Sequence, residues 1–207
     1  GGIYARLYTA DLDGKNVKLI NDSGRMSHFC WRNETELLGW GGLKNPINSL
    51  RRYKNFAKYV IKPLMPIYRL IARGDSIDGT SAISRVASGD SYILFNGYTG
   101  KTSRVGTAVL NKDGHPSFSP INNDVFLTDT YPGSDHKCSL FLYNIKNDEL
   151  VVADKLNSIP EYDNSPLRCD LHPKWSHCGG FVCIDTMHEG TRGMFLYKVE
   201  GVNNTNE

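Results

Sequence analysis

The sequence lacks the short motifs that mark several common enzyme classes. It contains no G-x-x-x-x-G-K-[ST], no G-x-G-x-x-G, no G-x-S-x-G and no H-E-x-x-H. Each of these motifs holds a phosphate, a nucleophilic serine or a zinc ion through one particular local backbone or spacing. The sequence therefore predicts no nucleotide cofactor, no α/β-hydrolase nucleophile and no zincin site.

Long apolar runs and paired cysteines are also missing. No stretch of about 18 apolar residues occurs, so we expect no membrane-spanning helix. The five cysteines are odd in number and include no C-x-x-C pair, which argues against a zinc ribbon or a disulfide framework. We expect most of them to be reduced thiols, with Cys30 and Cys183 filling core positions of strands.

Basic residues outnumber acidic residues only slightly. A formal net charge of +2 gives no reason to expect a nucleic-acid partner. No signal peptide opens the chain, and its first residue is Gly rather than Met, which suggests a processed piece. The location is left open on these grounds, as a soluble protein of the cytoplasm or the periplasm.

A seven-residue phrase occurs twice in the second half of the chain, at residues 113–119 (DGHPSFS) and 170–176 (DLHPKWS). Each copy is followed by an apolar run that closes with Asp-Thr, and then by another apolar run. Repetition of short strands at a period above about 40 residues is typical of a propeller or a related β-array. We therefore predict an all-β fold, a single β-propeller segment, for residues 1–207.

The first part of the chain follows the same order of elements. Residues 3–20 read as a hairpin around an Asp-Gly turn, and residues 21–25 as a loop. A degenerate third copy of the phrase places His28 where the two complete copies have His115 and His172. The sequence predicts blades, the last one short of a strand, over residues 26–40 with 91–110, over 114–156 and over 170–199.

About three four-stranded blades cannot close a ring, since propellers use about four to eight. We expect the chain to be part of a larger propeller, or to close with other copies of itself or with a missing half. The unpaired strands at its ends would otherwise promote aggregation.

Residues 44–90 interrupt the blade pattern. Eight basic residues and no acidic one lie between Lys44 and Arg73, and apolar residues recur among them at helical spacing. This predicts one basic helical insertion followed by a loop. Three interpretations stay open: a helical lid packed on the propeller, a helix at a membrane surface through residues 50–72, and a lid that draws an anionic polymer toward the channel.

The phrase also carries the candidate metal ligands. In a propeller the innermost strands line the central channel, and side chains two apart on a strand face the same way. We expect an Asp and a His to project together from each complete phrase, with a third imidazole from the degenerate copy. Imidazoles and carboxylates at one end of a channel suit a divalent metal such as Mn²⁺, Zn²⁺ or Ca²⁺. The candidate ligands are His28, His115, His172, Asp113 and Asp170.

A structural role is the alternative for every one of these residues. Histidines here could hydrogen-bond between blades, and Asp129 and Asp185, which close the apolar runs, could cap turns. Three further residues are candidate catalytic groups. His188 belongs to a His-Glu-Gly turn that is added to the repeat, although a solvated turn is its alternative, while Arg168 and Arg192 could bind a carboxylate through two hydrogen bonds.

Two stretches resemble a known class of propeller. Residues 7–16 (LYTADLDGKN) and 115–120 (HPSFSP) are similar to the repeats of TolB-type, WD40-like propellers. Residues 24–31 (GRMSHFCW), the two His-Pro-x-aromatic phrases and the His-Glu-Gly turn at 188–190 narrow the resemblance to the oligogalacturonate lyase group of seven-bladed propellers. That resemblance implies a Mn²⁺ held in the channel by histidines and a glutamine, and cleavage by β-elimination.

Position by position, the resemblance implies that His28 and His172 are metal ligands. The group has a second histidine two residues before the one that matches His172, and here that position is Asp170. Its glutamine ligand corresponds roughly to Leu167, which cannot bind a metal. An aspartate in place of a histidine would supply an oxygen ligand and shift the preference toward harder ions.

Two functions follow as hypotheses. The first is a carbohydrate-related propeller that acts as a metal-dependent polysaccharide lyase on acidic oligosaccharides. In this hypothesis the cation and an arginine neutralise a uronate carboxylate while a histidine takes the adjacent proton. The second is a non-catalytic propeller that binds a glycan or a protein partner in envelope polysaccharide metabolism, with the basic helix as its docking element.

Overall fold

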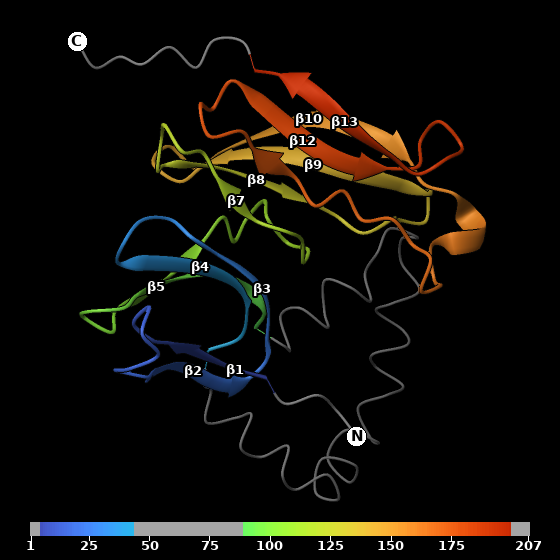
Figure 1. Cartoon of the computed structure of the whole chain (residues 1–207). Helices are drawn as coiled ribbons and strands as arrows, with labels where there is room; N and C mark the ends of the chain where they lie inside the picture. Colours follow the sequence, from blue (N-terminus) through green and yellow to red (C-terminus); the bar gives the residue numbers. More distant parts are fainter. Residues whose placement is uncertain (1–4, 44–88, 200–207) are drawn as a thin grey trace, which may run out of the picture. The chain divides into compact units, whose positions relative to one another are not determined.

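The structure, a computed structural model, describes residues 5–43 and 89–199 (Figure 1). Within these ranges the regular secondary structure is almost entirely strands, arranged in four sheets. The described residues divide into two compact units, residues 5–26 with 41–43 and 89–90, and residues 27–40 with 91–199. The predicted helical insertion falls outside the described residues, apart from its last two positions. In the part that is described, no helix is long and apolar enough to span a membrane.

The first unit contains the predicted hairpin, formed by β1 (Ala5–Thr9) and β2 (Lys18–Gly24). Its turn has the form that Asp-Gly favours, because Gly14 takes a φ of 78° and its N–H donates to the Asp11 carbonyl.

The second strand of this hairpin is longer than the sequence predicts. We expected residues 21–25 to form a loop, but β2 continues to Gly24, which pairs with Ala5. The polar Asn21 is tolerated in the strand because its side chain donates to the Gly42 carbonyl and accepts the N–H of Ser23.

The second unit contains three sheets that match the predicted blades strand for strand. In each sheet the strands lie in chain order, as in a propeller blade. The first blade consists of β3 (Met26–Trp31), β4 (Glu36–Gly41), β5 (Ser91–Asn96) and β6 (Thr102–Val105). The second consists of β7 (Ser117–Phe118), β8 (Val125–Asp129), β9 (Lys137–Asn144) and β10 (Glu149–Asn157). The third consists of β11 (Lys174–Trp175), β12 (Phe181–Thr186) and β13 (Gly193–Lys198).

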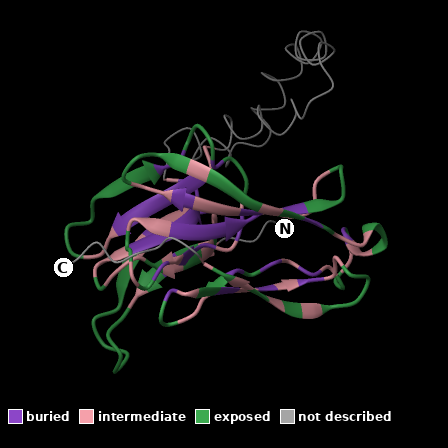
Figure 2. Ribbon diagram, turned by 90° about the horizontal axis from the view of Figure 1, so that it is seen from above, coloured by how far each residue is buried: buried purple, intermediate pink, exposed green. Residues whose placement is uncertain are grey.

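The second blade is buried on both faces, because side chains alternate along its strands. On β8, Phe126 packs in a cluster with residues of the first blade such as Leu38 and Tyr92. Its neighbour Leu127 packs in a second cluster with Val182 and other residues of the third blade. Figure 2 shows buried residues along the strands of these sheets, whereas the turns are mostly exposed. Apolar burial between blades is therefore the main source of cohesion in this unit.

Hydrogen bonds between side chains and neighbouring blades accompany this packing. The Tyr92 hydroxyl lies 2.5 Å from the Thr128 hydroxyl, where both are fully buried between the first and second blades. The Trp175 indole N–H donates to the Ser117 carbonyl at 3.0 Å and joins the third blade to the second.

The Asp and the His of each phrase lie just before the innermost strand of the blade rather than on it. β7 and β11 are only two residues long, so His115 and His172 fall in the segments that lead into these strands. Strand alternation therefore does not govern the direction of their side chains. Instead, the backbone N–H groups of His115 and His172 both donate to the Asp129 carboxylate at the end of β8.

All five cysteines are free thiols. Cys138 and Cys169 are buried, and Cys30 is half-buried against the cluster between the first and second blades. Burial raises the pKa of the Cys30 thiol to about 12. The predicted core position is wrong for Cys183, because its neighbours Val182 and Ile184 occupy the buried positions of β12.

We predict that Gly114→Ala destabilises the protein. An added Cβ would collide with the Asp129 carbonyl oxygen and lie 2.7 Å from the Thr128 hydroxyl. The expected loss is roughly 1–3 kcal/mol in the free energy of unfolding, measured by urea denaturation. Gly180→Ala is the control, since its Cβ would meet only the Cys178 sulfur at 3.5 Å. Equal stability of the two variants would contradict this packing.

Candidate functional site

Three imidazole rings from three successive blades lie in a row. His28 is on β3, and His115 and His172 each precede the innermost strand of their blade by two residues. The ring centroids are 4.1 Å apart from His28 to His115 and again from His115 to His172. The structure thus brings together the histidines that the repeat places at equivalent positions, and we call them the histidine row.

A carboxylate lies near the Nδ1 atom of each ring in the row. A carboxylate there favours a proton on Nδ1 and leaves the Nε2 atom with a lone pair. In residues 5–43 and 89–199, none of the three Nε2 atoms has a hydrogen-bond partner. The pairs are His28 with Asp113 (3.1 Å), His115 with Asp129 (3.0 Å) and His172 with Asp185 (3.8 Å).

Asp129 connects the row to the fold. Its residue is only 2% exposed, and its carboxylate accepts the backbone N–H of His115 at 2.6 Å and that of His172 at 3.1 Å. It also contacts Nδ1 of His115 through both oxygens. His172 adopts a φ of 43°, a left-handed conformation that is uncommon for histidine. One buried carboxylate therefore positions the backbone of two ligand candidates from two blades.

Asp113 contacts His28 rather than pairing with His115. Its carboxylate accepts the Ser27 hydroxyl at 2.6 Å and the Gly114 N–H at 2.9 Å, and it lies 3.1 Å from Nδ1 of His28. Asp113 thus supports the ring of the preceding blade, because Ser27 and His28 take its oxygens, and in the described residues no hydrogen bond joins it to His115. The hydrogen bond to Asp113 raises the pKa of His28 above its ordinary value, although burial opposes this.

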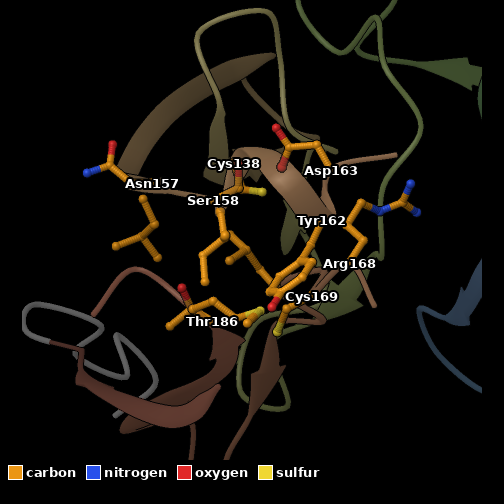
Figure 3. Close-up of a pocket in the computed structure, with 12 residues that line it drawn as sticks. Cys138, Asn157, Ser158, Tyr162, Asp163, Arg168, Cys169 and Thr186 are labelled. Atoms are coloured by element: carbon orange, nitrogen blue, oxygen red, sulfur yellow. The ribbon is translucent and has the colours of Figure 1, made fainter. Parts of the chain in front are cut away.

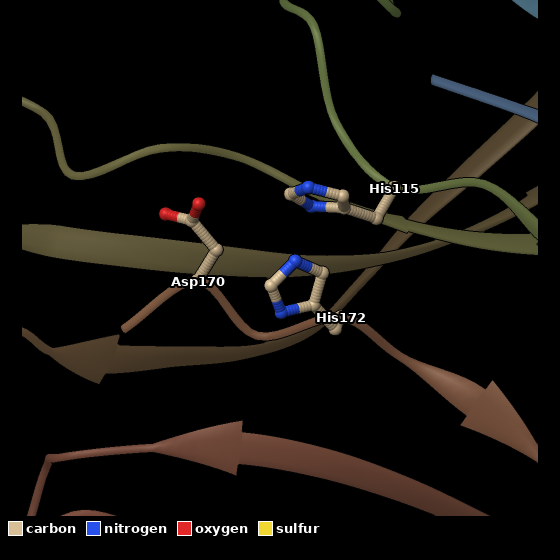
Figure 4. Close-up of side chains that lie close together, drawn as sticks. All are labelled: His115, Asp170 and His172. Atoms are coloured by element: carbon tan, nitrogen blue, oxygen red, sulfur yellow. The ribbon is translucent and has the colours of Figure 1, made fainter. Parts of the chain in front are cut away.

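Asp170 does project beside His172, as the phrase predicts. Ligand atoms of His115, Asp170 and His172 all lie within 4.8 Å of one another. Figure 4 shows the two rings side by side, with the Asp170 carboxylate to one side of them. Two residues of the row and Asp170 are thus the group best suited to hold a metal ion, and we call these three residues the metal triad.

Arg168 holds Asp170 through two hydrogen bonds, 2.6 Å from Nε and 3.1 Å from a terminal nitrogen. Its guanidinium carbon also lies 4.3 Å from the centroid of the Tyr131 ring. That ring is 5.9 Å from His115 and 6.4 Å from His28, centroid to centroid. Burial raises the pKa of Tyr131 to about 12, so its hydroxyl stays protonated at neutral pH.

The other two candidate catalytic residues make their contacts elsewhere. Arg192 donates to the Cys169 sulfur at 3.4 Å and to the Arg168 carbonyl at 3.3 Å. His188 lies in the turn after β12, 3.2 Å from the Thr186 hydroxyl, with its ring 4.6 Å from that of Phe195. None of the contacts described for His188 is with the histidine row.

A small cavity lies beside this region, between the second and third blades (Figure 3). Its lining includes Tyr162, whose ring points into it, and Arg168, whose guanidinium points away from it. The cavity encloses about 10 Å³, which is room for about one water molecule. It is therefore too small to receive a substrate.

Sequence reasoning assigned no site role to Asp129, Asp185, Tyr131 or Ser27. A signal for the first two was present, because the Asp-Thr that ends β8 recurs at the end of β12. Tyr131 and Ser27 stand at repeat positions, but other residue types occupy those positions in the other copies, so the repeat did not mark them.

The chain was compared with known proteins. No family model matches it, and no curated protein matches it. Among solved structures, TolB from Acinetobacter baumannii matches with a TM-score of 0.59 and 12% sequence identity, over 96% of this chain and 36% of that one. An oligogalacturonate lyase from Vibrio parahaemolyticus matches with a TM-score of 0.55 and 14% identity, over 94% of this chain and 42% of that one.

The four sheets and these matches define the class of the protein as a β-propeller, as the sequence predicts. More narrowly, its fold is TolB-like. The chain spans well under half the length of either matched protein, which agrees with a partial set of blades.

We predict that the raised pKa of His28 depends on Asp113. In metal-free protein His28 should titrate above about 6.5, the ordinary value for histidine, and Asp113→Asn should move it down. Because the folded-state pKa is the higher one, the contribution to stability is full below the unfolded-state pKa and is lost as pH rises through the folded-state pKa.

NMR titration of the His28 ring and urea denaturation at several pH values test this prediction. Asp124→Asn is the control, because this substitution removes the same charge at a carboxylate that pairs with Arg32. An unchanged His28 titration in Asp113→Asn would show that Asp113 does not set the pKa.

Proposed function

We propose that the metal triad holds a divalent transition metal and that the histidine row is the reaction centre of a polysaccharide lyase for acidic oligosaccharides. The observation that carries the proposal is the row itself, with a carboxylate near each Nδ1 and its Nε2 atoms available. The likeness to an oligogalacturonate lyase supports the choice of substrate class.

The donor set of the triad fits a first-row metal. Ligand atoms about 2.1 Å from one ion lie at most about 4.2 Å apart, so a spread of up to 4.8 Å has to close by only about half an ångström. Asp129, which contacts Nδ1 of His115, supplies the outer hydrogen bond that metal-bound histidines usually make. Two imidazoles and one carboxylate suit Mn²⁺ or Zn²⁺ better than Ca²⁺, which prefers six to eight oxygen ligands.

Arg168 acts in this proposal on Asp170 rather than on the substrate. Its two hydrogen bonds fix the carboxylate plane, and each carboxylate oxygen keeps a second lone pair for a metal. His28 extends the row as the third imidazole, next to His115 but outside the triad.

A bound cation would neutralise the uronate carboxylate and so acidify the adjacent C–H bond. His28 is suited to take that proton on Nε2, because Asp113 orients its ring and stabilises the positive charge that forms. The electrons of the broken C–H bond form the new carbon–carbon double bond, and the glycosidic C–O bond breaks at the neighbouring carbon. The Tyr131 hydroxyl, protonated at neutral pH and close to the rings, is suited to donate a proton to the leaving oxygen.

A second candidate function is non-catalytic binding of an acidic glycan. It is favoured by the pairing of Arg168 with Asp170, in which each group neutralises the other. In this function Asp170 is occupied by Arg168 rather than by a metal ion, so a glycan would bind without metal-dependent cleavage.

The metal site predicts a stoichiometric divalent metal in the purified protein. His172→Ala should lose it, and Asp129→Asn should weaken its affinity by about 10–100-fold through loss of the outer hydrogen bonds. Elemental analysis and calorimetric titration with Mn²⁺ and Zn²⁺ provide the measurement. His177→Ala is the control, an exposed histidine in the turn between β11 and β12. A wild-type protein that binds neither metal would overturn the site.

The lyase proposal predicts an unsaturated product that absorbs in the ultraviolet when the metal-loaded protein meets oligogalacturonate. The rate should rise as pH increases through the raised pKa of His28, because the base must be unprotonated. His28→Gln should lower the rate by about 10²–10⁴-fold, whereas His177→Gln should not. An oligosaccharide that binds but is recovered unchanged would favour the second candidate.

A further inference from the structure

A second, larger cavity lies on the second blade, outside the metal triad. It encloses about 340 Å³ and is lined by the segment 109–112, the end of β8, the start of β9 and part of β10. This volume is at the lower end of the range of about 300–1,000 Å³ that is typical of small-molecule sites. We call it the lysine pocket, after the three lysines that line it.

Lys112, Lys137 and Lys155 reach the pocket from three different segments, and all three residues are exposed. In the described ranges, none of their ammonium groups has a carboxylate within ion-pair distance. Two acidic residues also line the pocket, and the Asp129 carboxylate accepts N–H donors of the histidine row. Hydrogen bonds from neutral N–H groups leave the negative charge of Asp129 in place, so together with Asp135 the lining carries a formal charge of +1, three ammonium groups against two carboxylates.

The rest of the lining is mixed. Thr130 and Ser139 bring hydroxyl groups, and Phe141 brings a large apolar side chain. The Thr130 hydroxyl oxygen accepts the N–H of Ser139 at 3.0 Å, which leaves its own proton available to a ligand. Ammonium groups, hydroxyls and an apolar surface together match a sugar-sized ring that carries an anionic group and hydroxyls.

The pocket adjoins the histidine row. Asp129 lines the pocket and accepts hydrogen bonds from two residues of the row, and Lys112 directly precedes Asp113 in the chain. Neighbouring strands of the second blade are antiparallel, so β8 ends and β9 begins at the same end of the sheet, where the segment with His115 leads into β7. A ligand that extends beyond the row on this side would meet the three lysines.

We propose that the lysine pocket is an anion-binding subsite that takes a carboxylate-bearing sugar unit of an acidic oligosaccharide. The identity of the ligand rests on the proposed function. The affinity for an anion rests only on the three unpaired ammonium groups.

The test uses metal-free protein, so that the pocket is probed without the triad. Calorimetric titration with trigalacturonate should show binding that weakens as salt rises, because exposed charges are screened. The triple variant K112Q/K137Q/K155Q should lose about tenfold affinity or more, the effect expected for losing at least one hydrogen bond to a charged group. K146Q is the matched control, since Lys146 lies in the turn at the opposite end of the same sheet.

Two further ligands test whether the pocket recognises a sugar carboxylate or another anion. Fully methyl-esterified trigalacturonate has no charge and should bind weakly to every variant. If inorganic phosphate binds more tightly than trigalacturonate and loses this affinity in the triple variant, the sugar assignment is wrong. Thermal denaturation checks that the triple variant is folded.

The outcomes distinguish this proposal from the proposed function. The triple variant should keep the metal stoichiometry of the wild type, whereas His172→Ala should lose the metal. Equal affinity of the triple variant and the wild type would overturn the pocket and leave the metal site unaffected.

Discussion

The Asp129 carboxylate is buried at the end of β8 and accepts hydrogen bonds from the backbone of two different blades. A carboxylate removed from water is stable only if its oxygens are fully hydrogen-bonded, and here the donors come from His115 and His172. The geometry of the histidine row is therefore coupled to the packing of the second blade against the third. A shift of either blade would displace an imidazole ring of the row as well as the apolar side chains between the blades.

The strands of all three blades could be predicted from the sequence, because apolar runs and turn residues recur in the same order. The equivalence of His28, His115 and His172 was also readable, since it rests on repeat position alone. The carboxylate that contacts each ring could not be predicted from repeat position. His115 contacts the Asp129 of its own blade, whereas His28 contacts Asp113, which belongs to the next blade.

This difference has a physical cause. The hydrogen bonds at the starts of β4 and β8 show which positions of the two strands are equivalent, and by this comparison Trp40 of β4 corresponds to Asp129 of β8. The first blade therefore has no carboxylate of its own at that position. Asp113 fills the same role from a different part of the fold. A role that moves from one blade to the next cannot be found by aligning repeats. It becomes visible only when the side chains are placed in space.

The row also explains how several polar groups are accommodated near an apolar interior. Asp113 contacts the Nδ1 atom of His28, and Asp170 pairs with the Arg168 guanidinium, so each of these carboxylates has a partner at contact distance. The lysine pocket differs in this respect, because its three ammonium groups have no such partner in the described residues. Paired charges suit a preorganised centre, whereas unpaired ones suit recognition of an incoming anion.

The φ of 43° at His172 has a consequence for how the protein balances stability against function. A left-handed conformation costs a residue with a Cβ roughly 1–2 kcal/mol, whereas glycine adopts it at almost no cost. Glycine at this position would thus favour the folded state while removing the imidazole. Selection for stability alone would drive the chain away from histidine here. The strained backbone is therefore the kind of local conflict that tends to occur where an activity, rather than the fold, requires a particular side chain.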